Sequence, residues 1–306
     1  MASAAPLSLQ RLLQDFPVLG ESLQGAERAA RTDAPVLLLG EPGSGRSTVA
    51  RALHAASRRS AAPLVEVDPG AFPSTLFESE LFGFRPGAFT GAEKGSEGRV
   101  ARAEGGTLLL DHVEELPLAT QPKLLRLIAE RRYAPLGGVE VGADIRFIAL
   151  GAEDLPARVG RETFRADLFY RLEVLAFRIP PLRERRRDLD AVIDHLLADL
   201  AERFARPDLV LAPRARAWMR DHPWPGNLRQ LRNVLERALV LSERGPLDPP
   251  QPEGSTEGRP RPLLEVEKEL IRNALAYTRG HQGHAADLLG ISRKALWEKR
   301  RRYGIP

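Results

Sequence analysis

A glycine-rich stretch early in the chain has the composition and spacing of a phosphate-binding loop. Its nine residues are Gly40, Glu41, Pro42, Gly43, Ser44, Gly45, Arg46, Ser47 and Thr48. Glycines at these spacings let backbone N–H groups turn toward phosphate oxygens at the start of a helix. The Ser47 hydroxyl could bind Mg²⁺. Arg46, however, stands where lysine is expected, and a planar guanidinium is not equivalent to a compact ammonium in a tight loop.

The segments around this loop predict how it is positioned. An apolar run precedes the loop and a helical stretch, residues 49–57, follows it, which is the context in which such a loop binds phosphate. Another apolar run ends in Asp111, whose carboxylate would reach the metal ion through water. The predicted strands are residues 35–39, 64–67, 106–111 and 145–150. Helices between them, such as residues 121–131, predict a parallel sheet covered on both faces.

A second glycine-containing stretch is suited to contact another molecule. It consists of Gly87, Ala88, Phe89, Thr90, Gly91 and Ala92. The two glycines free the backbone from the usual restriction on φ, so a large aromatic ring is carried on a flexible turn. We expect this loop to present Phe89 to a partner. The alternative is an ordinary surface turn with one inward-pointing phenylalanine.

Composition narrows the class of protein. A chain of 306 residues with 43% hydrophobic and 28% charged residues is long enough for two or three globular domains. Because cysteine is absent, disulfides and thiolate metal sites are excluded. No apolar run is long enough to span a membrane, and residues 1–16 lack the pattern of a signal peptide. We therefore expect an unprocessed cytoplasmic protein.

The C-terminal segment has the features of a DNA-binding module. The last 44 residues hold nine Lys/Arg and five Asp/Glu, and so account for the whole formal net charge of +4. The predicted helices are residues 263–278, 284–289 and 293–303. Ser292 is a good N-cap for the last of these, and a basic helix after a short glycine-containing turn is the helix-turn-helix pattern. This pattern predicts binding to double-stranded DNA, and a charged, solvated helix is the alternative.

Five motifs together resemble the AAA+ domain of bacterial enhancer-binding proteins, the activators of sigma-54 RNA polymerase. They are ESELFG followed by GAFTGA at 78–92, GGTLLLD at 105–111, FRADLFYRL at 164–172, PPLRER at 180–185 and HPWPGNLRQL at 222–231. The C-terminal segment resembles the Fis-type module of the same family. The resemblance implies a P-loop AAA+ α/β fold with an all-α lid subdomain and a C-terminal all-α helix-turn-helix domain.

The resemblance also implies an activity, partners and residue roles. It implies an ATPase that forms a homo-oligomeric ring, usually a hexamer although a dimer is possible, and whose loop at 87–92 touches sigma-54 through Phe89 and Thr90. Arg165 and Arg171 would reach into the neighbouring subunit's ATP site, and Arg229 would sense the phosphates from the lid. Ser292, Arg293, Lys294 and Trp297 would lie near the DNA groove, and Lys299, Arg300, Arg301 and Arg302 would contact DNA phosphates.

Domain boundaries follow from the same motifs and from composition. We expect an N-terminal tail at 1–18 with one helix after it, the α/β subdomain at 19–183, the lid at 184–244, a linker at 245–262 and the DNA-binding domain at 263–306. The lid would contain helices 188–204 and 227–242. The 33 residues before the first strand are too few for a sensory domain, so we expect regulation through expression or a partner protein.

The nucleotide site departs from the family's pattern at four places. Besides Arg46, His112 replaces the water-activating glutamate, Gly151 and Ala152 replace a Thr-Asn sensor, and Asp68 replaces the asparagine that pairs with the glutamate. Glu114 and Glu115 are too far from the strand end to substitute.

Two interpretations of these departures remain. In the first, the chain is a degenerate ATPase that acts as a DNA-binding co-regulator or repressor, or lends Arg165 and Arg171 to an active homologue in a mixed ring. In the second, Asp68 orients His112, and the imidazole activates the attacking water.

Overall fold

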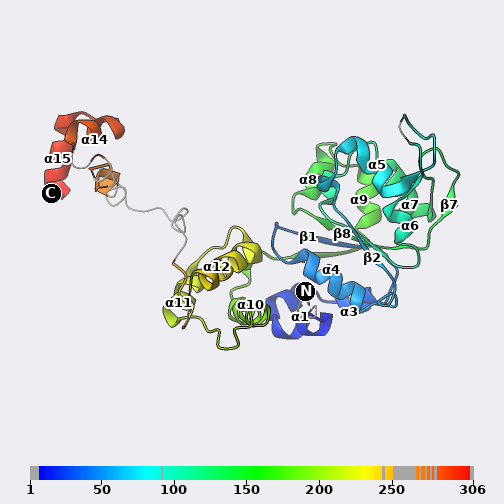
Figure 1. Ribbon diagram of the computed structural model, residues 1–306, viewed down its shortest axis with the longest axis horizontal. Coiled ribbons are helices and arrows are strands. Elements are labelled where there is room, and N and C mark those ends of the chain that lie inside the picture. Colours follow the sequence, from blue (N-terminus) through cyan, green and yellow to red (C-terminus); the bar gives the residue numbers. More distant parts are fainter. Residues whose placement is uncertain are drawn as a thin grey trace. The chain divides into compact units, whose positions relative to one another are not determined.

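The chain forms two units, residues 1–251 and 252–306, which are described separately (Figure 1). The computed structural model describes residues 7–90, 92–242, 245–250 and 281–303, together with 267–268, 270–272, 274–275 and 278. Within these residues, no helix is both long and apolar enough to cross a membrane.

A five-stranded parallel sheet in the order β2-β5-β8-β1-β9 lies at the centre of the first unit. Its strands are β1 (Val36–Gly40), β2 (Leu64–Val67), β5 (Thr107–Leu110), β8 (Arg146–Gly151) and β9 (Leu175–Ile179). The first four confirm the predicted strands to within one or two residues. The fifth, β9, was missed, because Arg178 interrupts its short apolar sequence.

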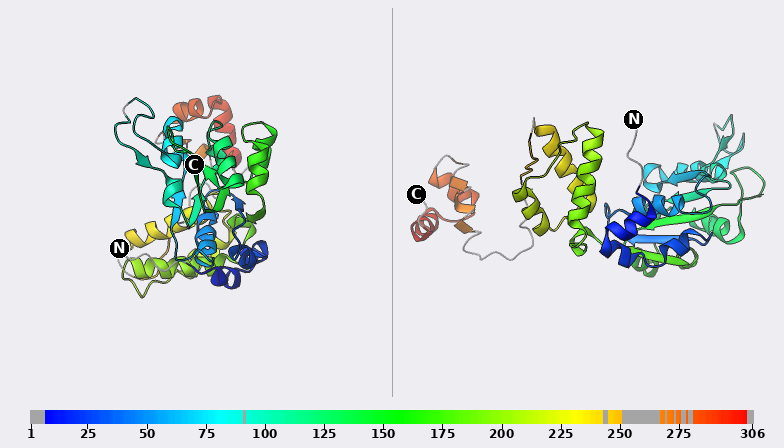
Figure 2. Two further views of the ribbon diagram at one scale, coloured as in Figure 1. Left: turned by 90° about the vertical axis from the view of Figure 1, so that its right-hand side faces the viewer. Right: turned by 90° about the horizontal axis from the view of Figure 1, so that it is seen from below.

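Apolar residues that alternate along the strands build a separate core on each face of the sheet, because successive side chains of a strand point to opposite faces. Leu38 and Ile148 pack with the N-terminal helices, whereas Leu37 and Ala149 pack with the later helices. Figures 1 and 2 show the two helical layers. The first layer is α1 (Leu9–Asp15), α2 (Pro17–Ser22), α3 (Ala26–Ala30) and α4 (Arg46–Ala55). The second is α5 (Ser74–Phe82), α6 (Arg99–Arg102), α7 (Gln121–Glu130), α8 (Leu155–Gly160) and α9 (Ala166–Leu172).

The N-terminal segment differs from the predicted tail followed by one helix. Leu9, Leu12, Phe16 and Leu19 are all buried in the core that α4 shares. Their spacing of three or four residues matches one face of a helix. The Ser8 hydroxyl caps α1 by accepting from the backbone N–H of Arg11 at 3.3 Å. Residues 7–18 therefore belong to the folded α/β unit, and the tail prediction is wrong for them.

Two short hairpins project from the α/β unit. The first pairs β3 (Gly83–Phe84) with β4 (Ser96–Glu97), and the second pairs β6 (Arg132–Tyr133) with β7 (Val141–Gly142). The loop between β3 and β4 contains the GAFTGA sequence. Three short 3-10 helices complete the unit at η1 (Pro69–Ala71), η2 (Val113–Glu115) and η3 (Leu182–Glu184).

Three helices follow η3 and form the lid. They are α10 (Leu189–Arg203), α11 (Pro213–Asp221) and α12 (Asn227–Leu241). The first and last match the predicted lid helices, whereas α11 was not predicted. Residues 245–250, which we predicted as linker, also pack on the lid: Leu247 is buried and pairs with Leu211, and the Trp218 indole donates to the carbonyl of Pro249 at 3.2 Å.

The second unit is a small helical domain. Helices α14 (Gln282–Leu288) and α15 (Arg293–Tyr303) confirm the last two predicted helices. Of the predicted helix at 263–278, residues 267–268, 270–272 and 274–275 are helical, Thr278 lies in a turn, and the others lie outside the described residues. Ile271, Ala285 and Leu296 form its core.

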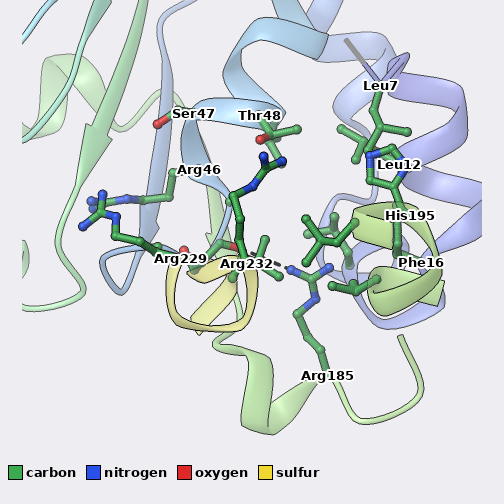
Figure 3. Close-up of a pocket in the computed structure, with 18 of the residues that line it drawn as sticks. Leu7, Leu12, Phe16, Arg46, Ser47, Thr48, Arg185, His195, Arg229 and Arg232 are labelled. Carbon is green, nitrogen blue, oxygen red and sulfur yellow. Dashed lines mark hydrogen bonds between the residues drawn. The ribbon is translucent and has the colours of Figure 1, made fainter. Parts of the chain in front are cut away.

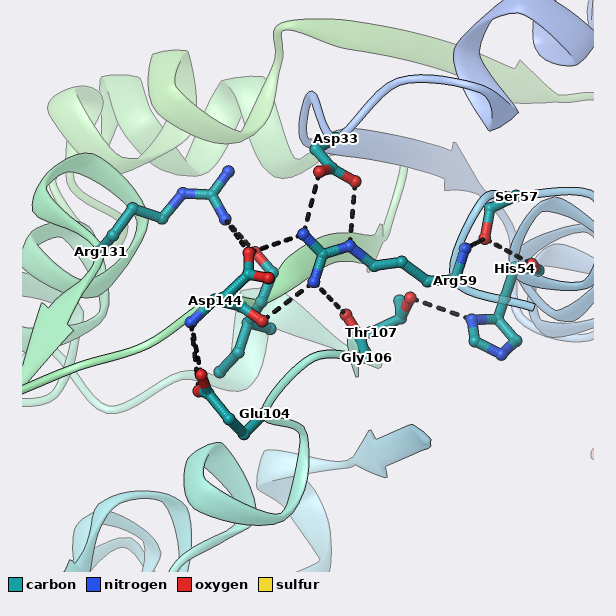
Figure 4. Close-up of polar contacts among 10 residues, drawn as sticks. Asp33, His54, Ser57, Arg59, Glu104, Gly106, Thr107, Arg131 and Asp144 are labelled. Atoms are coloured by element: carbon teal, nitrogen blue, oxygen red, sulfur yellow. Dashed lines mark hydrogen bonds and ion pairs between the residues drawn. The ribbon is translucent and has the colours of Figure 1, made fainter. Parts of the chain in front are cut away.

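A polar cluster joins three connections at the edge of the sheet opposite the glycine-rich loop (Figure 4). The Arg59 guanidinium donates to both carboxylate oxygens of Asp33, at 3.0 and 2.9 Å, and to the carboxylate of Asp144 at 2.7 Å. These bonds tie together the segments before β1, after α4 and before β8. The Arg59 hydrogen bond also holds the pKa of Asp33 below its ordinary value.

Replacing Arg59 with methionine should destabilise the α/β unit by about 1–3 kcal/mol at neutral pH, because charge-assisted hydrogen bonds are lost. Since folding lowers the pKa of Asp33, that carboxylate's contribution is complete above its unfolded-state pKa and is lost as the pH falls through its folded-state pKa. The difference between wild type and Arg59→Met should therefore shrink below about pH 4. Chemical denaturation at several pH values measures it. Arg58→Met, at an exposed neighbouring arginine, is the matched control and should have little effect.

Candidate functional site

The glycine-rich loop connects β1 to α4, as predicted. Gly43 and Gly45 have φ values of 75° and 106°, which residues with a Cβ rarely adopt. A Cβ at Gly43 would also come within 2.8 Å of the carbonyl oxygen of Gly226, in the lid. Both the backbone conformation and the close approach of the lid therefore require glycine at position 43.

Residues in and next to the lid bind this loop at the Glu41 side chain and at two of the loop's backbone carbonyls. Arg183 donates to the two carboxylate oxygens of Glu41 at 2.8 and 2.6 Å, which lowers the pKa of Glu41. The buried Asn227 amide donates to Glu41 at 3.0 Å and to the carbonyl of Pro42 at 3.2 Å. The N–H of Leu228 donates to the carbonyl of Gly43 at 3.0 Å. The conformation of the loop is thus coupled to the position of α12.

A buried ion pair extends this coupling to the N-terminal helices. Arg185 donates to the carboxylate of Asp188 at 3.1 Å and to the carbonyl of Ser44 at 3.3 Å. Asp188 also accepts from the backbone N–H groups of Val18 and Leu19 at 2.9 and 3.0 Å. Burial lowers the pKa of Arg185. The residues that begin the lid, the loop and α2 therefore meet at one charged contact.

A pocket of about 340 Å³ lies between the loop, the lid and the N-terminal helices. Leu7, Leu12 and Phe16 form an apolar part of its wall, together with His195 of α10, whose pKa is lowered by burial. In Figure 3, Arg46 and Arg229 extend on the side away from these apolar residues. The pocket therefore offers apolar surface at one end and guanidinium groups at the other.

The guanidinium groups of the pocket differ in their partners. Arg185 is paired with Asp188, and Arg232 is paired with Asp199 at 2.8 Å. Arg46 and Arg229 have no carboxylate within ion-pair distance among the residues that the structure describes. Two positive charges are therefore available to an anionic ligand.

Three polar side chains of the pocket determine how well it fits a nucleotide with Mg²⁺. The Ser44 hydroxyl is buried and has no hydrogen-bond partner in the described part of the chain, as expected of a group that awaits a ligand. Ser47 and Asp111 both line the pocket. The described residues contain no group of three or more His, Asp or Glu side chains arranged to hold a metal ion by themselves, but Mg²⁺ in nucleotide sites takes only one or two protein ligands and completes its shell with phosphates and water. The residues present fit a nucleotide with Mg²⁺.

Asp68 and His112 lie together at the ends of neighbouring strands. The His112 Nδ1 is 3.3 Å from a carboxylate oxygen of Asp68 and 3.6 Å from one of Asp111. His112 has a left-handed backbone with φ 46°, and its N–H donates to Asp111 at 2.9 Å. Asp68 and His112 are therefore neighbours, as the second interpretation requires, and His112 lines the pocket.

Arg46 also contacts the end of β8, where the departures at Gly151 and Ala152 lie. Its guanidinium donates to the carbonyl of Gly151, the last residue of β8. The N–H of Ala152 donates to the carboxylate of Glu114 at 3.1 Å. Glu114 thus faces the end of β8, and it has not taken the place of the glutamate that His112 replaces.

The two arginines predicted to act on a neighbouring subunit are both exposed: Arg165 is the N-cap residue of α9, and Arg171 lies in its last turn. Arg165 forms a two-point ion pair with Asp167, at 3.0 and 2.7 Å. Arg171 donates to the carbonyl of Ala129 at 3.3 Å. Neither of them lines the pocket of its own chain.

The GAFTGA loop presents its phenylalanine to solvent. The Phe89 side chain is 43% exposed, and its ring lies 4.9 Å from the ring of Phe84. The turn is closed by hydrogen bonds from the N–H of Gly87 to the carbonyl of Ala92, at 2.8 Å, and from the N–H of Ala92 to the carbonyl of Phe89, at 3.0 Å. Thr90 is exposed, and Gly91 lies outside the described residues.

The basic helix α15 presents most of the predicted DNA-binding residues. The Ser292 hydroxyl caps it by accepting from the N–H of Ala295 at 3.1 Å. Ser292, Arg293, Lys294, Trp297, Arg301 and Arg302 are exposed, and Lys299 and Arg300 are half-buried. Lys299 forms an ion pair with Glu267, so its charge is partly neutralised within the domain. This pairing makes Lys299 a weaker candidate for a phosphate contact than Arg301.

Several residues of the site were not found from the sequence. They are the apolar residues of the N-terminal helices, His195, Arg232, Asp188 and Asn227. The spacing of Leu9, Leu12, Phe16 and Leu19 could have identified the first group, because it places one apolar face on consecutive helical turns. Asp188 and Asn227 act through long-range contacts that no local pattern encodes.

Three protein-family models together match almost the whole chain. The model for the Sigma-54 interaction domain matches residues 12–178, the AAA+ ATPase lid domain matches 183–251, and the bacterial regulatory protein, Fis family, matches 262–303.

Relatives and solved structures agree with the family models. The C4-dicarboxylate transport transcriptional regulatory protein DctD of Rhizobium meliloti is 41% identical over 96% of this chain, which spans 64% of that protein. The transcriptional regulatory protein ZraR of Escherichia coli is 42% identical over 92% of this chain, which spans 66% of ZraR. The crystal structure of NtrX from Brucella abortus in complex with ATP is similar with a TM-score of 0.70 and 32% identity, over 94% of this chain and 68% of NtrX.

Replacing Asp188 with alanine should reduce the free energy of unfolding by about 3–5 kcal/mol, because Arg185 would remain buried without its carboxylate. Replacing Asp190, two residues along α10 and paired with Arg216 and Arg220 at the surface, should cost about 0–1 kcal/mol. Chemical denaturation of both variants measures the difference. Equal effects would show that the buried pair does not hold the lid.

Proposed function

We propose that this chain, which belongs to the sigma-54 interaction domain family, is a sigma-54-dependent transcriptional regulator of the cytoplasm. In this proposal α15 binds double-stranded DNA, the P-loop pocket binds ATP with Mg²⁺, and the GAFTGA loop contacts the sigma-54 RNA polymerase. The chain assembles into a homo-oligomer, which is a hexameric ring or a dimer, and uses ATP binding and hydrolysis to remodel the closed promoter complex.

The exposure of Phe89 is the observation that carries this proposal. An aromatic ring loses favourable burial when it is left in solvent, so a loop that displays one is suited to contact a partner. The loop follows α5, whose buried residues pack on the sheet, and the P-loop begins at the end of the central strand β1 of that sheet. A nucleotide-dependent movement of the sheet's carboxyl edge could therefore reach Phe89.

One end of the pocket is apolar and the other is positively charged, and this difference supports nucleotide binding. Leu7, Leu12 and Phe16 suit a base, and the guanidiniums of Arg46 and Arg229 suit phosphates. Ser47 and Asp111 would hold Mg²⁺. An ATP-bound metal would neutralise phosphate charge during hydrolysis, and Arg165 and Arg171 are exposed for a neighbouring subunit's site.

A second candidate function is that of a DNA-binding co-regulator or repressor that does not hydrolyse ATP itself. The observation that favours it is the bond from Arg46 to Gly151, which turns the P-loop cation toward β8. Such a chain could still supply Arg165 and Arg171 to a homologue in a mixed ring.

Open-complex formation with sigma-54 polymerase in vitro tests the proposed function. We expect the wild type to form open complexes only when ATP is present, and Phe89→Ala to reduce their yield at least tenfold while ATP binding and stability stay nearly unchanged. The matched control is Leu76→Ala, at an exposed apolar residue of α5, which should behave as wild type. Full activity of Phe89→Ala would rule out the loop as the contact.

Steady-state ATP turnover separates the two candidate functions. If Asp68 and His112 activate water, the wild type should hydrolyse ATP and His112→Ala should lose at least a hundredfold in rate, within the range by which general bases act. Gly43→Val is the inactive reference, because its side chain would collide with the Gly226 carbonyl. Wild-type turnover no greater than that of Gly43→Val would support the co-regulator that does not hydrolyse ATP.

A further inference from the structure

Arg46 lies in an unusual place for the cation of a P-loop. It is the first residue of α4, and its side chain is 5% exposed. The guanidinium does not stay over its own loop, because it donates to the carbonyl of Gly151 at the end of β8. The side chain therefore reaches from the loop after β1 to the end of the neighbouring strand.

The end of β8 has no polar side chain of its own. Gly151 has no side chain, and a Cβ there would come within 2.9 Å of the Leu155 side chain and 3.0 Å of the Leu39 side chain, so a larger residue would require both leucines to shift. The next residue is alanine, and the N–H of Ala152 is already bonded to Glu114 at 3.1 Å. The guanidinium of Arg46 thus brings hydrogen-bond donors to a strand end that would otherwise offer none to a ligand.

Sheet order places this strand end in the centre of the site. β8 lies between β5, which leads into Asp111, and β1, which leads into the P-loop. A phosphate held by the loop and by a metal at Asp111 would therefore lie against the end of β8. If the base of the nucleotide occupies the apolar end of the pocket, the phosphate at this strand end is the one furthest from the base.

Arg46 has donors left for such a phosphate. A guanidinium carries five N–H donors, and the described residues provide Arg46 with one acceptor, the Gly151 carbonyl. Arginine can bind a phosphate through two parallel hydrogen bonds, whereas lysine acts as a point charge on a shorter head group. Only the guanidinium can hold the Gly151 carbonyl and a phosphate oxygen at the same time in a fixed geometry.

We propose that Arg46 binds the terminal phosphate of a nucleoside triphosphate while it holds the Gly151 carbonyl. One side chain then acts as the P-loop cation and also as the group at the end of β8 that distinguishes a triphosphate from a diphosphate. This inference rests on the proposed function, because it requires that the pocket binds a nucleotide. Arg46 would thus supply the polar group that the small residues Gly151 and Ala152 do not provide.

The variant Arg46→Lys tests the proposal directly, because it restores the residue expected in a P-loop. We expect it to weaken ATP binding at least tenfold and to change ADP binding less than threefold, so that the preference for ATP over ADP is lost. Affinities are measured by calorimetry on the full chain with Mg²⁺ present, with ADP and with a non-hydrolysable ATP analogue so that turnover does not contribute. Arg51→Lys, an exposed arginine of the same helix that pairs with Glu66, is the control and should keep the wild-type values.

Arg46→Lys that binds ATP as tightly as the wild type, or more tightly, would overturn the proposal. If Arg46→Lys is poorly folded by circular dichroism, Arg46→Gln replaces it, and the same loss of preference is expected because the charge is removed. A wild type that binds neither nucleotide would instead overturn the proposed nucleotide site itself.

Discussion

The contact between Glu41 and the lid residues Arg183 and Asn227 is the interaction on which the rest of the structure depends. It ties the phosphate-binding loop to a helical subdomain whose first helix begins more than 140 residues later. The backbone carbonyls of Pro42, Gly43 and Ser44 are bound by lid residues as well. A loop built from glycines has little conformational preference of its own. The lid supplies the order that the loop lacks, so the pocket exists only while the two subdomains are docked.

In the same region the two arginines of the P-loop pocket and the Asp–His group lie on different sides of β8. Arg46 and Arg229 have no carboxylate partner within the described part of the chain, and the opposite wall of the pocket is apolar. Asp68, Asp111 and His112 gather on the other side of β8, at the ends of β2 and β5. Neighbouring parallel strands end at the same edge of a sheet, and this explains how residues far apart in sequence come within hydrogen-bond distance. The site is therefore complete in its architecture although its residues differ from the family's pattern.

Sequence patterns predicted the parts of this protein that depend on local order. The apolar run before Gly40 and the run ending at Asp111 identified two central strands, and Ser292 located the start of α15. The Asp68 and His112 contact was also predicted, because both residues end strands. Patterns missed the bond from Arg46 to Gly151 and the role of Asp188, since these depend on how distant segments pack. They also misjudged residues 7–18, whose helices are too short to form without the core that buries them.

The carboxylate of Asp188 also joins the N-terminal helices to the residues that begin the lid. Its Oδ1 accepts the N–H of Val18, and its Oδ2 accepts both the N–H of Leu19 and the Nε–H of Arg185. A displacement of α2 by an angstrom would stretch these bonds or carry Arg185 with it. Because Arg185 also holds the Ser44 carbonyl, a displacement of the N-terminal helices would shift the glycine-rich loop as well. The first two helices of the chain are therefore mechanically coupled to the pocket.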